Sequence, residues 1–133
     1  MNVYLDTSAF LAILDADDEN HTLAKKVWEN LLTSGTPVIS SSYVLVETYA
    51  LVQRRLGMEA LRVFHEDILP LVQVKWINAE LHHYGANAVL TANRRNLSLV
   101  DTVSFAVMRE LGIKKVFAFD RHFTEQGFEC IEN

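Results

Sequence analysis

Residues 98–123 read SLVDTVSFAVMRELGIKKVFAFDRHF, and this stretch holds a helix pattern, a strand pattern and two acids in order. Ser98 is a typical N-cap residue, and Gly112 follows the last helical position, where a left-handed residue often ends a helix. The run KVFAF, residues 115–119, then predicts a short buried strand. Asp120 comes directly after that strand, where a carboxylate without a partner is costly to bury. The stretch therefore predicts a helix-to-strand unit that ends in an acid in need of a partner.

The same alternation of helix and strand extends over the rest of the chain. Strand character is found in four more runs: NVYL (2–5), PVIS (37–40), LVQVKWI (71–77) and FECI (128–131). Helical patterns lie between them, at residues 9–14, 20–32, 42–57, 58–69 and 78–95. Strands separated by helices, without hairpin signals, predict crossover connections and a mainly parallel sheet with helices on both faces. We therefore expect an α/β fold in a single domain over residues 1–133.

Three residues are expected to mark helix ends in these patterns. Asn20 and Asn78 are placed to cap the helices that follow them, because asparagine is favoured at the N-cap. Pro70 is expected to end the helix that begins at Met58.

Composition narrows the class of protein. The chain has 133 residues, of which 50% are hydrophobic and 22% charged, as in one globular domain. Its formal net charge of -5 argues against non-specific coating of nucleic acid, which depends on excess lysine and arginine. The single cysteine, Cys130, excludes an internal disulfide and a cysteine-based zinc site. No apolar run reaches about 18 residues, so we expect no membrane span and a cytoplasmic location.

Four acids are expected at one edge of the sheet. Asp6 and Asp120 each follow a strand, and the carboxyl ends of parallel strands share one edge. Glu47 and Asp101 lie near the starts of helices at that edge. Both sit in mostly apolar helices, YVLVETYALV and SLVDTVSFAVM, which disfavours fully solvated side chains. The pattern therefore predicts a pocket with four carboxylates.

Each acid also has an ordinary structural explanation. Asp6 could cap the following helix, and Asp101 fits a capping box with Ser98. Glu47 could lie on a helix surface, and Asp120 could form a turn. These alternatives stay open from the residues alone.

Four carboxylates in one pocket would repel one another unless cations neutralised them. Oxygen ligands without cysteine favour hard ions, so Mg²⁺ or Mn²⁺ is expected in preference to Zn²⁺. Two such ions are a common means by which nucleases activate water and stabilise the leaving oxygen. The pocket is therefore expected to attract phosphate.

Three segments resemble the PIN domain ribonucleases, most closely the VapC-type toxins of toxin-antitoxin pairs. They are VYLDTSAFLAIL, ISSSYVLVETYALV and LSLVDTVSFAVMRELGIKKVFAFDRHF, and the resemblance covers nearly the whole chain. It implies a five-stranded parallel sheet, an endoribonuclease dependent on Mg²⁺ or Mn²⁺, an RNA substrate and a cognate antitoxin. By position it assigns the catalytic and metal-binding quartet to Asp6, Glu47, Asp101 and Asp120, with Ser8 in a supporting role. Many relatives carry a hydroxyl residue just before the last acid, where this chain has Ala118 and Phe119.

The resemblance also implies hydrolysis in which water attacks phosphorus in line and leaves a 5′-phosphate and a 3′-hydroxyl. Four side chains near the acids could contact the RNA backbone: Arg94, Arg95, Arg121 and His122. A plain solvated surface is the alternative for these four.

Other functions are also compatible with parts of the pattern. An aspartyl phosphatase would use Asp6 as nucleophile but needs a second aspartate two residues later, where Ser8 stands. A receiver-like phosphoacceptor needs an acid pair after the first strand, which is absent. A catalytically silent interaction protein with the PIN fold stays open. A homodimer is expected from the family resemblance and from apolar helix positions: Val44, Leu45, Leu51 and Val52.

Overall fold

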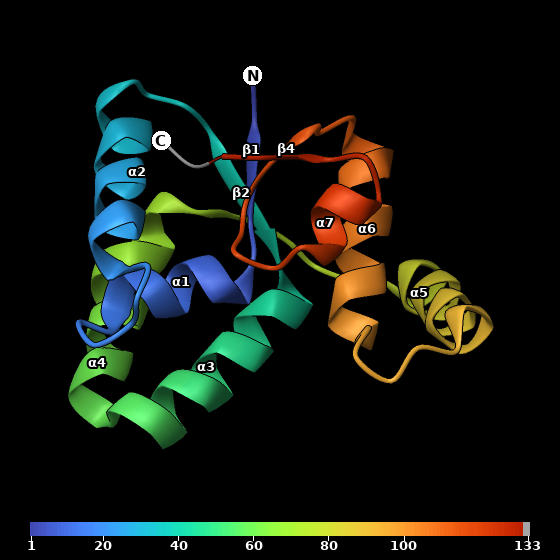
Figure 1. The fold of residues 1–133 in the computed structure, drawn as a ribbon, viewed down its shortest axis with the longest axis horizontal. Coiled ribbons are helices and arrows are strands. Elements are labelled where there is room, and N and C mark those ends of the chain that lie inside the picture. Colours follow the sequence, from blue (N-terminus) through green and yellow to red (C-terminus); the bar gives the residue numbers. More distant parts are fainter. Residues whose placement is uncertain (132–133) are drawn as a thin grey trace.

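The computed structural model describes residues 1–131 as a five-stranded sheet flanked by helices (Figure 1). The strand order is β3-β2-β1-β4-β5, and all four pairings are parallel. The strands are β1 (Val3–Leu5), β2 (Val38–Ser41), β3 (Gln73–Lys75), β4 (Lys115–Phe117) and β5 (Glu129–Cys130). The expected α/β class with a five-stranded parallel sheet is confirmed.

Helices cover both faces of the sheet. They are α1 (Thr7–Leu14), α2 (His21–Thr33), α3 (Ser42–Leu56), α4 (Met58–Val63), α5 (Ala79–Ala92), α6 (Leu99–Leu111) and α7 (His122–Glu125). In Figure 1, α1 and α2 lie on one side of the central strand β1, and α5 and α6 lie on the other. Among the helices of residues 1–131, none has the length and apolar character needed to cross a membrane.

The central strand and α6 form the middle of the core. All three residues of β1 are buried, and so are residues 101–108 of α6. The buried Tyr4 hydroxyl donates to Ser104 Oγ at 2.8 Å, which satisfies both polar groups inside the core. This bond ties β1 to the helix that carries Asp101.

Local sequence signals placed two helix starts and one helix end correctly. Ser98 Oγ accepts from the backbone N–H of Asp101, and Asn78 Oδ1 accepts from that of Leu81. Gly112 ends α6 with a φ of 68°, a left-handed conformation that glycine adopts without strain.

The prediction of one regular α-helix over residues 58–69 is wrong, because only residues 58–63 are α-helical. After α4 the chain widens into a π-helix, η1 (Phe64–Ile68), and then tightens into a 3₁₀ turn, η2 (Leu69–Leu71), that contains Pro70. The Leu69 N–H donates to Phe64 O, five residues back. Because a proline ring clashes with the carbonyl four residues earlier, Pro70 disfavours the regular α-helical spacing here.

Two other helix limits differ from expectation. Asn20 precedes α2 but makes no side-chain cap, since its ψ of 6° is not the extended conformation that a capping residue needs. The helix expected to reach Arg95 ends at Ala92, because Asn93 adopts the left-handed conformation with a φ of 53°.

The apolar residues that suggested a homodimer belong to the chain's own core. Val44 and Val52 are 0% exposed, and Leu45 is 6% exposed. Leu51 is half-buried. These side chains are therefore not a free surface for a second copy, and the homodimer itself stays a prediction that light scattering of the purified chain would test.

Candidate metal centre

The neighbouring strands β1 and β4 end at the same edge of the sheet and bring the acids that follow them together. Leu5 of β1 is in register with Phe117 of β4, and the Asp6 N–H donates to Phe117 O at 3.2 Å. Asp120 follows three residues after Phe117. The carboxyl edge of β1 and β4 is therefore the floor of a site with acids from both strands.

Asp6 is held in place by the residue that was expected to support it. Its Oδ2 accepts from Ser8 Oγ at 2.8 Å and from the Ser8 N–H at 3.2 Å, so it caps α1. Ser8 Oγ in turn accepts from the Phe119 N–H at 2.9 Å. Ser8 thus links the end of β1 to the segment that leads into Asp120. The Asp6 side chain is buried, with the residue 5% exposed.

Asp101 combines a capping role with burial. Its Oδ2 accepts from the Ser98 N–H at 3.0 Å, which completes a capping box at the start of α6. The residue is 7% exposed. A helix cap needs no such burial, so the capping role explains the position of Asp101 but not its enclosure.

His122 lies between Asp101 and Asp120. Its Nδ1 is 2.9 Å from Asp120 Oδ1 and 3.5 Å from Asp101 Oδ2. The Asp120 Oδ1 atom already accepts the His122 backbone N–H at 2.9 Å. Although it is close to both acids, Nδ1 has no hydrogen-bond partner of acceptable geometry among residues 1–131. The solvated-surface alternative is wrong for His122, because the residue is only 8% exposed.

Burial shifts the protonation of two of these acids. Burial raises the pKa of Asp6 to about 7; the charges of Asp101 and Asp120 add to the shift, and the Ser8 hydrogen bonds oppose it. The pKa of Asp101 is also raised, mainly by burial and further by Asp120, against the bonds from Ser98. Within residues 1–131, no lysine or arginine forms an ion pair with any of the three acids. The site therefore concentrates acids that no lysine or arginine of residues 1–131 pairs with, and His122 is the cationic group that acts against the rise in the Asp101 pKa.

The donor atoms at this edge fit a divalent cation. Asp101, Asp120 and His122 each offer one ligand atom, and these atoms all lie within 4.8 Å of one another. Two carboxylate oxygens and one imidazole nitrogen are ordinary ligands for such ions. The charges of Asp101 and Asp120 raise the pKa of Asp6, but Asp6 lies outside this three-residue group.

Glu47 is not brought into that group. It lies in the second turn of α3, half-buried, and takes part in no ion pair among the described residues. Its neighbour Thr48 donates to Thr7 Oγ1 at 3.2 Å, so this turn of α3 packs beside the start of α1. Glu47 as a metal ligand stays a prediction.

The expected RNA-contacting arginines divide into two groups. Arg94 and Arg121 line an open pocket of about 460 Å³ that Asp120 and His122 also line. Arg94 pairs there with Glu125 at 3.2 Å, and Arg121 is exposed. Arg95 lies in a separate hollow between the end of α5 and the following loop. The first two arginines are therefore next to the acids, and Arg95 is further removed.

The fold, the acids and the order of elements define the class: the chain belongs to the PIN domain family, whose model matches residues 3–129. Within the family, it is 35% identical over 128 residues to the 23S rRNA-specific endonuclease VapC20 of Mycobacterium tuberculosis, with 95% of each chain covered. The VapC ribonuclease of Aquifex aeolicus is 24% identical over 131 residues, covering 96% of this chain and 93% of its own.

Solved structures support the same fold. The crystal structure of VapC20, described as a toxin that cleaves the sarcin-ricin loop, superposes with a TM-score of 0.86 at 32% identity, covering 98% and 99% of the two chains. The VapBC2 complex of Rickettsia felis bound to promoter DNA matches with a TM-score of 0.72 at 12% identity, covering 98% of each chain, and at that identity supports the fold alone.

Proposed function

We propose that this chain is a metal-dependent endoribonuclease that hydrolyses RNA phosphodiesters and acts as the toxin of a toxin-antitoxin pair. The observation that carries the proposal is the group of carboxylates at the carboxyl edge of β1 and β4, where Asp6 and Asp101 are buried and no lysine or arginine of residues 1–131 pairs with an acid. Buried charges are paired or coordinate metals, so a divalent cation is the partner that this edge requires. The similarity to VapC20 and to the Aquifex VapC ribonuclease supports the nuclease part of the proposal.

Each acid has a distinct part in this proposal. Asp101 and Asp120 would hold the metal directly, while Asp6, fixed by Ser8, would complete the site from the β1 side. Glu47 is the fourth proposed ligand, from α3. A bound Mg²⁺ or Mn²⁺ supplies Lewis-acid activation of water and neutralises charge on the phosphate. The carboxylates would keep that ion at the strand ends, beside the open pocket proposed to receive the RNA backbone.

Arginines beside the acids would orient the phosphodiester. Because the chain carries a net charge of -5, RNA must be attracted locally and not by the whole surface. Arg121 is exposed and forms no ion pair within residues 1–131, so it could contact a phosphate, whereas Arg94 must first release Glu125. Arg95 would contact only the phosphates of RNA nucleotides that lie further from the cleaved bond.

Large-subunit ribosomal RNA is the first substrate to test, because VapC20 is named for 23S rRNA and its structure for the sarcin-ricin loop. The test incubates purified chain with intact ribosomes and with total RNA, in Mg²⁺, Mn²⁺ or EDTA, followed by 5′-end mapping. We expect cleavage only with metal, at a limited set of positions, with 5′-phosphate ends.

The control is Asp101→Asn, which keeps the size of the side chain and removes its charge. Cleavage that persists in EDTA or in this variant would refute the metal-dependent mechanism. A cyclic phosphate or 5′-hydroxyl product would instead assign the attack to the ribose 2′-hydroxyl.

The toxin role has a separate test. We expect expression of the chain alone to stop growth, and co-expression of the protein encoded beside it to restore growth. Asp101→Asn should be harmless without that partner. Equal toxicity of the wild type and the variant would argue against a nuclease toxin.

A further inference from the structure

We propose that His122 Nδ1 is itself a ligand of the metal at this site and gives it a preference for Mn²⁺ over Mg²⁺. The inference rests on the proposed metal-dependent function but concerns a residue outside the acidic quartet. It starts from a buried nitrogen that lies between two carboxylates and lacks a hydrogen-bond partner among residues 1–131.

The imidazole is held firmly in this position. Its side chain is 10% exposed, and the backbone N–H of His122 donates to Asp120 Oδ1. The next residue, Phe123, is fully buried and packs edge-on against Phe105 of α6, with ring centroids 5.0 Å apart. The start of α7 is thus fastened both to Asp120 and to the helix that carries Asp101. The ring does not need to move to reach the acids.

A hydrogen bond explains the close approach poorly. An imidazole N–H lies in the plane of its ring and needs an acceptor nearly in line with it. Asp120 Oδ1 is 2.9 Å from Nδ1, but the geometry fails that requirement, and Asp101 Oδ2 is further away at 3.5 Å. In the neutral tautomer protonated at Nε2, the Nδ1 lone pair lies beside the two carboxylates, where a shared cation would stabilise it.

The spacing of the donors fits such a cation. Neighbouring ligands around an octahedral ion at about 2.1 Å are separated by about 3 Å. The distances from Nδ1 to the two carboxylates, 2.9 and 3.5 Å, lie close to that value. Nδ1 therefore lies at the spacing of a shared coordination sphere from each carboxylate, and the three ligand atoms lie within 4.8 Å of one another.

One nitrogen donor changes which ion the site prefers. Mg²⁺ is bound almost entirely by oxygen, whereas first-row transition ions accept imidazole readily. A site with only carboxylates would hold Mg²⁺ and Mn²⁺ by the same oxygen ligands. His122 would raise the affinity for Mn²⁺ selectively.

Titration calorimetry of the untagged chain with Mn²⁺ and with Mg²⁺, at one pH, tests the inference. His122→Asn places an amide near the Nδ1 position, so a hard oxygen ligand can replace the nitrogen. We expect the variant to lose about tenfold of its Mn²⁺ affinity and much less of its Mg²⁺ affinity. The matched control is His83→Asn, which removes an exposed imidazole from α5 and should change neither affinity.

A second measurement needs no substitution and covers the case in which His122→Asn fails to fold. Electron spin-echo spectra of Mn²⁺ bound to the wild type should show modulation from a directly bound imidazole ¹⁴N. Bound Mn²⁺ without that modulation, or equal losses of both ions in His122→Asn, would overturn the role of His122 and leave the carboxylate site standing. A wild type that binds neither ion would overturn the metal-dependent function together with this inference.

Discussion

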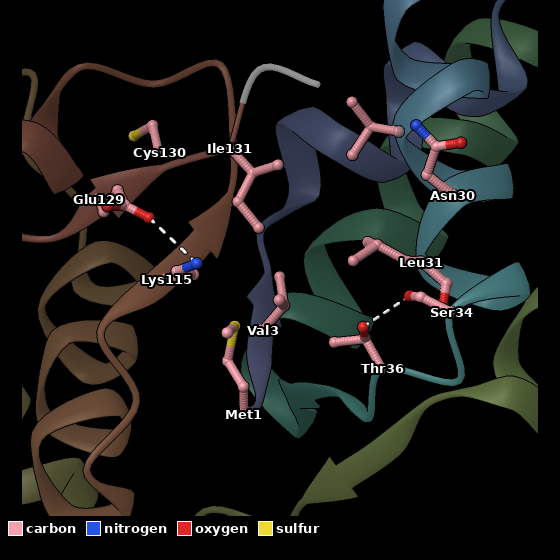
Figure 2. A pocket seen from close by; sticks show the side chains of 11 residues that line it. Met1, Val3, Asn30, Leu31, Ser34, Thr36, Lys115, Glu129, Cys130 and Ile131 are labelled. Carbon is pink, nitrogen blue, oxygen red and sulfur yellow. Dashed lines mark hydrogen bonds and ion pairs between the residues drawn. The ribbon is translucent and has the colours of Figure 1, made fainter.

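The two edges of the sheet differ in whether their charged side chains are paired. At the amino edge, Lys115 and Glu129 begin neighbouring strands and pair with each other at 3.5 Å, both side chains at least a third exposed. They line an open pocket of about 510 Å³ between the strand starts and the end of α2 (Figure 2). At the carboxyl edge, Asp6, Asp101 and Asp120 gather without an ion pair to any lysine or arginine of residues 1–131. The volume of a pocket therefore says less about function here than the balance of its charges.

The difference follows from which groups share each edge. At the amino edge a cation and an anion begin adjacent strands, so each offsets the other in water at little cost. At the carboxyl edge the chain buries acids of one sign, which lowers stability unless a ligand compensates. The edge that loses stability in this way is the one at which metal binding is proposed.

The largest effect is expected for Asp120→Asn. The substitution keeps the acceptor for the His122 backbone N–H but removes a proposed metal ligand and its charge. We expect RNA cleavage to fall by about 10²-fold or more. Glu129→Gln, the matched change at the amino edge, should leave the cleavage rate within about twofold. Initial rates on a defined RNA measure both, and equal losses in the two variants would abolish the contrast between the edges.

Asp6→Asn is expected to stabilise the metal-free protein at alkaline pH. The folded pKa of about 7 exceeds the ordinary value of 3.8, so the folded state holds its proton more tightly than the unfolded state. Stability of the wild type should therefore fall as pH rises from about 4 to about 7, by up to about 4 kcal/mol. Asparagine cannot ionise and still caps α1.

Urea denaturation in EDTA at pH 5 and pH 8 measures this effect. The gain of Asp6→Asn over the wild type should be greatest at pH 8 and shrink toward pH 5. Glu129→Gln should show no such dependence. A gain for Asp6→Asn that is the same at both pH values would mean that burial does not raise the pKa of Asp6.

Gly85→Ala is expected to destabilise the packing of α5 against α6, the helix that carries Asp101. A Cβ at Gly85 would lie 2.4 Å from Val103 Cγ2 and 3.3 Å from the Val103 backbone, so α5 would have to move away from α6. That movement would also strain the bond from Thr102 Oγ1 to Gly85 O at 2.8 Å. Overpacking of this kind costs about 1 to 3 kcal/mol, which outweighs the gain of about 1 kcal/mol in helix propensity.

Thermal unfolding of Gly85→Ala against Asn87→Ala tests the packing of α5 on α6. Asn87 is exposed on the same helix, so its replacement should stabilise by a few tenths of a kcal/mol. An unfolding temperature for Gly85→Ala at or above that of the wild type would show that α5 and α6 adjust without loss.

Features that depend on neighbours in sequence could be predicted. Ser98 and Gly112 bounded α6 because caps and left-handed glycines act locally. The nearness of Asp6 and Asp120 followed from one topological rule, that parallel strands end at a common edge.

Features that depend on packing were missed. His122 is buried next to Phe123, which packs on Phe105 of α6, a contact between separate elements that no local pattern encodes. The signal available was the position of His122, two residues after the strand-end acid. For Glu47, a helical position alone could not give the rotation of α3 relative to the acids, because an adjacent residue points about 100° away.

The smallest effect is expected at the amino edge itself, for Lys115→Met. The change breaks the pair with Glu129, but exposed pairs contribute only about 0 to 1 kcal/mol, and a methionine keeps most of the apolar stem. Denaturation at low and at high salt should differ little between the variant and the wild type, and RNA cleavage should be unchanged. A loss of cleavage would mean that the pocket in Figure 2 communicates with the acids across the length of β4. Only that result would make the amino edge a functional surface as well.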